Sequence, residues 1–223
     1  MKPKRSVEPT RDRRNPHAGA RTSKRPRPRT EAPEVRRDQL MNAAEQLFLE
    51  RGIAATTVDQ IVTSADVAKG TFYLYFPSKE NLLIALQQRY VARHAQYIGT
   101  AIECCAANDW AGRLDAWIEA GIGFYLDCLR LHDLVFHEFR PEDRGATHEN
   151  LAIVQLVAFL EEGVQAKAWT LEDTLFTASM LFHSLHGLLD ETVYAGKRID
   201  RKRLARAAKG FFRRALGLSD RAR

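Results

Sequence analysis

Apolar residues recur every three or four positions along most of this chain, and this spacing places them on one face of an α-helix. Helix start and stop signals divide the pattern into separate segments. The sequence therefore predicts an all-α protein. The expected helices cover residues 35–50, 57–65, 69–75, 78–105, 110–130, 131–139, 150–169, 171–189 and 200–216.

Residues 56–83 predict a helix, a tight turn, a second short helix and the start of a third helix. Thr57 is a natural N-cap, and Gln60 three residues later can reach back to complete a capping box. Asp66 interrupts the first helix, because aspartate tolerates turn conformations that most residues avoid. The pattern indicates a helix-turn-helix arrangement.

The second short helix, residues 69–75, combines a buried side with polar donors. Phe72 and Phe76 share a face because they are four residues apart. Ser78 can cap the next helix, and Lys79 then lies in its first turn, where a cation opposes the helix dipole. This position suggests an anionic partner. The alternative is that the two short helices only pack beside a helical core and that Lys79 is solvated. Donors suited to phosphate oxygens and base edges are Thr57, Lys69, Thr71, Tyr73, Tyr75 and Lys79.

The same stretch resembles the DNA-binding module of TetR-type transcriptional regulators. The resemblance is carried by Thr56-Thr57, Ile61-Val62, Ala65-Asp66-Val67, Gly70-Thr71-Phe72-Tyr73, Tyr75-Phe76 and Lys79-Glu80-Asn81-Leu82. Three positions depart from the family pattern: Val62 replaces Ala, Asp66 replaces the turn Gly, and Tyr75 replaces the usual His. The departure at Tyr75 leaves the base preference open.

The resemblance implies a double-stranded DNA operator as partner and a role for each matching residue. It implies that Thr57, Tyr73 and Lys79 contact phosphates. Residues in or beside the major groove would then be Lys69, Gly70, Thr71, Leu74 and Tyr75. The family also implies a homodimer, in which the last two helices form a four-helix bundle across a two-fold axis.

Charge and proline content set the N-terminal segment apart. Residues 1–30 carry 11 Lys or Arg against two acidic residues, and six of the eight prolines lie in residues 1–33. We expect residues 1–33 to be a disordered basic arm, which either lies along DNA or remains a solvated tail. The helix-turn-helix DNA-binding domain is expected at 34–80. Residues 31–93 carry seven basic and eight acidic side chains and so have almost no net charge. DNA binding must therefore depend on placed donors and on the arm.

Residues 81–218 are expected to form a helical ligand-binding and dimerisation domain. The long helix 78–105 can link it to the DNA module. The helix around residues 171–189 has apolar residues on two sides, one for its own domain and one for a partner. The final helix is predicted to bury Leu204, Ala208, Phe211, Ala215 and, less clearly, Phe212, with its basic side chains on a solvated face.

TetR-type proteins usually enclose a small-molecule effector, whose binding releases the dimer from its operator, and repression is their common mode. Aromatic and weakly polar residues of the second domain suit a hydrophobic ligand with one or two hydrogen-bonding groups. The alternative is that they are ordinary core residues. The candidates are Trp117, Phe124, Tyr125, Cys128, Phe136, His137, Phe139, Phe182 and His183.

Other classes of function find little support. Cys104, Cys105 and Cys128 lack metal-ligand spacing and fit reduced thiols in a cytoplasmic protein. His183, His186 and Asp190 can share one helix face, but a core or dimer-face role is expected for them, with no metal site. The sequence has no catalytic motif and indicates neither an enzyme nor a cofactor. It has no membrane span. The remaining alternative is a helical ligand-binding or adaptor protein without DNA binding.

Overall fold

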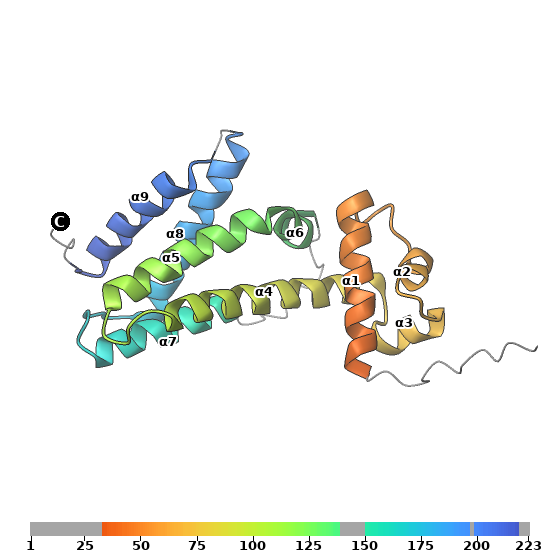
Figure 1. The fold of residues 1–223 in the computed structure, drawn as a ribbon, viewed down its shortest axis with the longest axis horizontal. Coiled ribbons are helices and arrows are strands. Elements are labelled where there is room, and N and C mark those ends of the chain that lie inside the picture. The colour runs from red at the N-terminus through yellow and green to blue at the C-terminus, as the bar shows by residue number, and fades with distance from the viewer. Residues whose placement is uncertain (1–32, 139–149, 197–198, 219–223) are drawn as a thin grey trace, which may run out of the picture.

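The computed structural model describes residues 33–138, 150–196 and 199–218, and every regular element within these ranges is helical (Figure 1). The predicted arm, except Pro33, and the candidate Phe139 fall outside these ranges. The elements are α1 Pro33–Arg51, α2 Val58–Ser64, α3 Lys69–Tyr75, α4 Lys79–Glu103, α5 Trp110–Asp127, α6 Leu129–Asp133, the π-helical turn η1 Leu134–Glu138, α7 Leu151–Gln165, α8 Thr174–Tyr194 and α9 Arg201–Ala215.

The helices form an N-terminal helix-turn-helix module and a C-terminal helical domain joined by α4. Figure 1 shows α1, α2 and α3 at one end of the molecule, and α5, α7, α8 and α9 around the far part of α4. Two clusters of buried side chains fill the two parts. Leu82, Leu86 and Tyr90 of α4 belong to the first cluster, whereas Ile98 and Ile102 belong to the second. A movement of α4 would therefore change the packing of both clusters.

The α6–η1 segment packs on the N-terminal module although it follows α5 in sequence. Arg130 donates a hydrogen bond to the Leu49 carbonyl of α1. Separately, the guanidinium of Arg89 joins α4 to α1, donating hydrogen bonds to Asn42 at 2.7 Å and to Glu45 at 2.5 Å. Side chains of this segment that complete the first cluster are Leu131, Leu134 and Val135.

Several predicted helix ends are wrong. The helix expected over 171–189 runs from Thr174 to Tyr194. The helix expected over 110–130 stops at Asp127, because Cys128 leaves helical geometry (φ −106°, ψ 16°) before α6 begins. The helix expected over 150–169 stops at Gln165, since Trp169 turns back onto it. The Trp169 indole donates to the Leu160 carbonyl at 2.8 Å, and its ring lies where a Cβ on Gly163 would be only 2.0 Å away.

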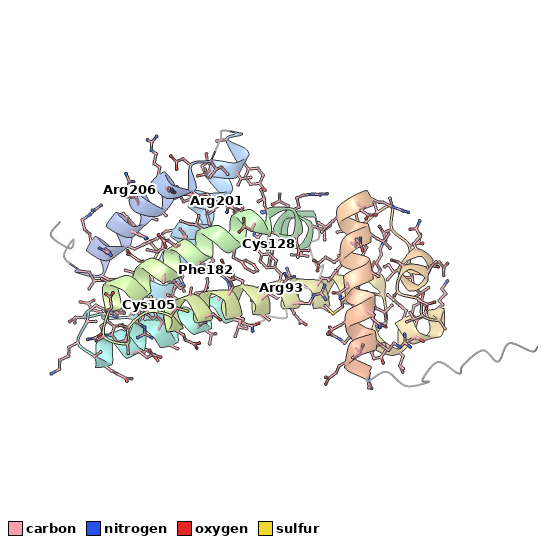
Figure 2. The ribbon with its side chains drawn as sticks, in the orientation of Figure 1. Arg93, Cys105, Cys128, Phe182, Arg201 and Arg206 are labelled. Carbon is pink, nitrogen blue, oxygen red and sulfur yellow. The ribbon has the colours of Figure 1, made fainter. Side chains whose placement is uncertain are left out.

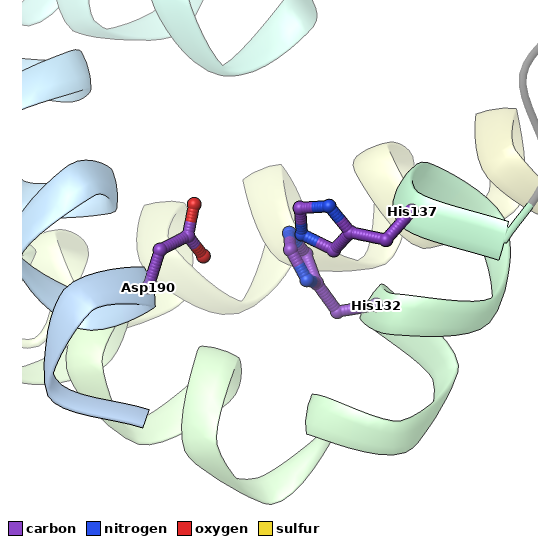
Figure 3. A group of neighbouring side chains, drawn as sticks. All are labelled: His132, His137 and Asp190. Carbon is purple, nitrogen blue, oxygen red and sulfur yellow. The ribbon is translucent and has the colours of Figure 1, made fainter. Parts of the chain in front are cut away.

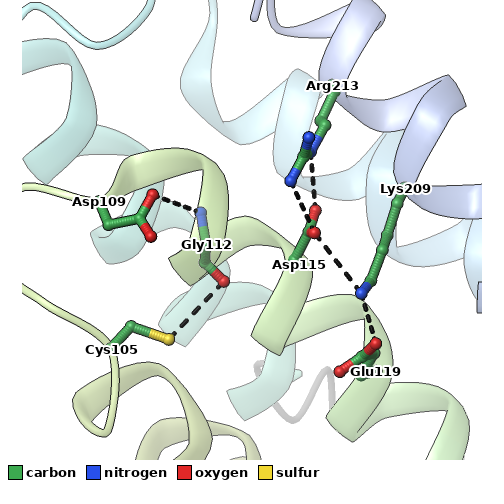
Figure 4. Close-up of polar contacts among 7 residues, drawn as sticks. All are labelled: Cys105, Asp109, Gly112, Asp115, Glu119, Lys209 and Arg213. Carbon is green, nitrogen blue, oxygen red and sulfur yellow. Dashed lines mark hydrogen bonds and ion pairs between the residues drawn. The ribbon is translucent and has the colours of Figure 1, made fainter. Parts of the chain in front are cut away.

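In the last helix Ala208 is buried as predicted, but the predictions for Leu204, Phe211 and Ala215 are wrong by one position. Phe212 is buried and Phe211 is 57% exposed. The buried stripe of α9 is Ala205, Ala208, Phe212 and Leu216. Its basic residues are not simply solvated. Arg213 makes two hydrogen bonds to Asp115 of α5, at 2.8 and 2.7 Å, and Lys209 pairs with Asp115 and Glu119 (Figure 4). These ion pairs fix which side of α9 faces α5.

The three cysteines are free thiols. Figure 2 places Cys105 beside the turn between α4 and α5, and Cys128 beside α6 at the other end of α5. None of the helices in the described ranges is long and apolar enough to cross a membrane.

Candidate nucleic-acid interface and interior cavity

The turn between α2 and α3 is closed by two backbone hydrogen bonds. The Val67 N–H donates to the Val62 carbonyl at 3.0 Å, and the Asp66 N–H donates to the Thr63 carbonyl at 3.3 Å. This is a Schellman motif, which requires a left-handed residue where glycine is usual. Asp66 supplies it with φ +53°. Aspartate therefore preserves the turn that the family pattern makes with glycine.

Helix α3 is held by its aromatic side and presents the opposite side outward. Phe72 is fully buried and Phe76 is 2% exposed, with ring centroids 5.7 Å apart. Tyr73 is 51% and Leu74 is 77% exposed. Figure 1 shows α3 at the end of the molecule away from the C-terminal domain. A short helix anchored in this way can enter a duplex groove.

The start of α3 is polar and open. A Cβ on Gly70 would meet nothing within 4 Å, so a backbone or phosphate can approach closely there. Lys69 pairs with Asp59 of α2 at 2.8 Å, and both side chains are more than half exposed. The hydrogen bond and charge of Asp59 raise the pKa of Lys69. Solvent screens so exposed a pair, which leaves the ammonium able to exchange Asp59 for a phosphate.

Thr57 and Lys79 are engaged within the protein to different degrees. Thr57 accepts a hydrogen bond from the Gln60 N–H at 3.3 Å, as the capping box predicts, and its own hydroxyl proton remains available. The Lys79 ammonium donates to the carbonyls of Ile53 at 2.9 Å and Thr56 at 3.0 Å. These bonds use two of its three protons and give the first-turn cation an internal partner.

A cavity of about 50 Å³ lies inside the C-terminal domain, between α4, α5, α7, α8 and η1. Its wall is mainly aromatic and aliphatic, with few polar groups. The lining residues are Tyr90, Val91, His94, Ile98, Trp117, Gly121, Tyr125, Phe136, Asn150, Ala152, Phe182, Leu185, His186 and Leu189. This volume holds a few water molecules and is well below the roughly 300–1,000 Å³ of ligand pockets.

Polar side chains contact Tyr125 and His186 of the cavity wall. The ring nitrogens Nε2 of His132 and His186 are 3.1 Å apart, and the Tyr125 hydroxyl donates to Asp190. Burial lowers the pKa of His94 and of His132 to about 4, and burial also lowers the pKa of His186. At neutral pH the histidines are therefore uncharged, so the wall is polarisable but carries little charge.

Comparison with known proteins supports the interpretation of the N-terminal module. The family model described as "Bacterial regulatory proteins, tetR family" matches residues 40–86. The transcriptional repressor NemR of Escherichia coli is 33% identical over 72 residues, and the transcriptional activator FasR of Mycolicibacterium smegmatis is 35% identical over 118 residues. Together with the solved structures below, these matches support a TetR-type regulator. These alignments cover 32% of this chain and 36% of NemR, and 52% of this chain and 53% of FasR.

The solved structures extend the likeness to the whole TetR fold. FadR from Bacillus halodurans, named a fatty acid degradation regulator, aligns with a TM-score of 0.65 and 26% identity, and covers 87% of this chain and 100% of its own. A putative TetR-family regulator from Shewanella aligns with a TM-score of 0.60 at 20% identity, over 81% and 97% of the two chains. The C-terminal domain therefore has the TetR architecture as well.

The structure brings together only some of the ligand-binding candidates predicted from sequence. Trp117, Tyr125, Phe136 and Phe182 line the cavity. The remaining described candidates lie elsewhere: Phe124 faces a surface groove beside Tyr97, Cys128 packs against the core of the TetR DNA module, and His137 and His183 are exposed.

Sequence reasoning missed His94 and His186 in the cavity wall. A positional signal existed for both, because His94 follows Tyr90 by four residues and His186 follows Phe182 by four. Each therefore shares a helix face with an aromatic residue that lines the cavity.

Proposed function

We propose that this TetR-family chain is a sequence-specific DNA-binding transcriptional regulator that acts in the cytoplasm as a homodimer. The observation that carries the proposal is the outward α3, which buries Phe72 and exposes Tyr73 and Leu74. Its groove-facing residues would be Lys69, Gly70, Thr71, Leu74 and Tyr75, with Thr57, Tyr73 and Lys79 on phosphates. For Lys79, one proton remains for that contact after its two internal bonds.

Homodimer formation is supported by an apolar face that the single chain leaves open. Along α8 and α9 the exposed large apolar side chains are Leu175, Phe176, Met180, Leu188, Tyr194 and Phe211. Burying such a face stabilises association by about 25 cal/mol per Å² of apolar surface before entropic costs are counted. Two recognition helices about one DNA turn apart, roughly 34–36 Å, could then read two half-sites.

We further propose that a small hydrophobic ligand releases the dimer from its operator, and that the mode is repression. The cavity supports this proposal because its wall is apolar and because α4, which carries the DNA module, forms part of it. A drug-sized ligand does not fit into about 50 Å³. Its binding must widen the cavity, and a ligand that prefers the widened state shifts the orientation of the two modules.

The test begins with purified protein and fragments of the source genome. Selected fragments define the operator, and binding is then measured with a panel of fatty acids, a first choice suggested by the relative FadR. We expect a discrete operator and at least one hydrophobic compound that lowers operator affinity. A reporter gene behind the operator should be expressed more strongly when the regulator gene is deleted, as repression requires.

The adaptor alternative makes the opposite prediction. A ligand-binding protein without DNA binding would enrich no fragment above background, although it could still bind the hydrophobic compounds. Enrichment without any effect of ligand would retain the regulator and overturn ligand release. Lower reporter expression after deletion would identify an activator, the function given in the name of the relative FasR.

A further inference from the structure

Three side chains of types that can ligate a metal ion, from three different elements, lie close together beside the cavity. His132 of α6, His137 of η1 and Asp190 of α8 each offer a ligand atom, and these atoms all lie within 4.8 Å of one another. In Figure 3 the Asp190 carboxylate points toward the two imidazole rings. We propose that His132, His137 and Asp190 bind a divalent transition-metal ion of the zinc class, with His186 as an additional nitrogen donor.

The donor types fit such an ion. Imidazole nitrogen and carboxylate oxygen are common ligands of Zn²⁺, whereas Mg²⁺ and Ca²⁺ prefer oxygen alone. Two histidines and one carboxylate provide three protein ligands. A fourth tetrahedral position would take His186 or water.

The three ligand atoms are up to 4.8 Å apart, which is wider than in a formed site. With metal–nitrogen bonds of about 2.0–2.1 Å, neighbouring ligand atoms of a tetrahedron are about 3.3 Å apart. The Nε2 atoms of His132 and His186 are 3.1 Å apart. Closing the remaining separations from 4.8 Å needs side-chain rotation, for which the exposed His137 has room.

Outer hydrogen bonds hold the ligands in a suitable orientation. His132 is 1% exposed, its Nδ1 lies 3.4 Å from the Asp133 carboxylate, and its Nε2 lies 3.1 Å from Nε2 of His186. The Tyr125 hydroxyl donates to one oxygen of Asp190, and the other oxygen can accept the ion. A carboxylate behind a ligating histidine is a usual feature of zinc sites.

An ion bound to this cluster would link α8 to the α6–η1 segment. The α6–η1 segment packs on the N-terminal module through Leu131 and Val135, and the Gln87 amide of α4 donates to the Val135 carbonyl at 3.3 Å. Asp190 lies on α8. An ion that joins the two would cross-link α8 to the segment that supports the module, and binding only to the folded chain raises the melting temperature.

The experiment uses the full chain without a histidine tag, treated with EDTA and dialysed. Titration with Co²⁺ should give saturable visible absorption of low-coordinate cobalt at one ion per chain. Zn²⁺ should displace it and raise the melting temperature. His137→Asn and Asp190→Asn should each weaken binding by at least about tenfold. Asp190→Asn keeps an oxygen to accept the Tyr125 hydrogen bond, so it tests ligation without removing that contact.

The matched control is His183→Asn, which removes another exposed histidine, on α8. It should bind as the unaltered chain does, and melting without metal checks that each variant is folded. No saturable Co²⁺ or Zn²⁺ binding by the unaltered chain would overturn the proposal. Equal binding by His137→Asn, Asp190→Asn and His183→Asn would also overturn it, because the ion would then be held elsewhere, for example by the cysteine thiols.

Discussion

Asp66 is one of two non-glycine residues in the described ranges with a positive φ, the other being Lys167. Both end a helix where glycine is the usual choice. For Asp66, the resemblance to TetR-type proteins identified the turn, and the ability of aspartate to adopt this conformation was predictable from sequence. Lys167 follows a helix end that the apolar pattern did not reveal, because the turn depends on Trp169 packing back onto α7.

Asp66→Val should lower the free energy of unfolding by about 1–2 kcal/mol, because a β-branched side chain is strained at φ +53°. Asp66→Gly is the matched control, and it should remain within about 1 kcal/mol of the unaltered chain. Urea denaturation measures both. Equal stability of the two variants would contradict the assigned turn.

His94 should make the protein less stable in mild acid. Its pKa is about 4 in the folded chain because of burial, against an ordinary value of 6.5. Between these values the unfolded chain binds more protons, so stability falls as the pH is lowered from about 6.5 toward 4. His94→Gln cannot titrate and should show a shallower loss in urea denaturation series at several pH values. An unchanged pH slope in this variant would show that His94 does not contribute.

Among the elements, helices with local signals were predicted well and those shaped by distant contacts were not. Thr57, Ser78 and Asp200 cap α2, α4 and α9 through side-chain hydrogen bonds that a sequence pattern can reveal. The register of α9 was missed because Phe211 and Phe212 are adjacent and equally apolar. Packing against α5 decides between them, and sequence spacing contains no information on that contact.

The α5–α9 ion pairs should stabilise the C-terminal domain. Asp115→Ala removes the acceptor of two Arg213 hydrogen bonds, and both side chains are at most 20% exposed. We expect a loss of about 1–3 kcal/mol. The control is Asp127→Ala, whose pair with Arg201 is more than half exposed and should contribute less than about 1 kcal/mol. Equal losses in thermal or urea denaturation would contradict a structural role for Asp115.

At the scale of the whole molecule, the candidate sites divide by how far their residues are separated in sequence. The proposed DNA-binding residues lie within 57–79, so one motif collects them. The cavity is lined by residues of α4, α5, η1, α7 and α8, and its lining depends on how each helix is rotated about its axis. Their aromatic character identified Trp117 and Phe182 as cavity residues. It also selected Phe124, which lines a surface groove beside Tyr97 and not the cavity.

Homodimer formation should depend on the exposed face of α8. Phe176→Glu places a charge on a position that is 64% exposed in the single chain, so it should leave the fold intact and yield a monomer. Leu151→Glu is the control, an equivalent change at a 46% exposed position on α7. Light scattering during size-exclusion chromatography measures the mass. Dimers of both variants would contradict the proposed interface.

The central claim is that α3 is the part of the chain that binds duplex DNA. Tyr73 and Tyr97 are both 51% exposed, but Tyr73 lies on α3 and Tyr97 lies on α4. The most direct measurement is the affinity of each Tyr→Ala variant for the selected operator at fixed salt. The account predicts that Tyr73→Ala, which loses a phosphate contact, binds at least about tenfold more weakly, whereas Tyr97→Ala binds like the unaltered chain. Equal affinities of all three proteins would contradict it.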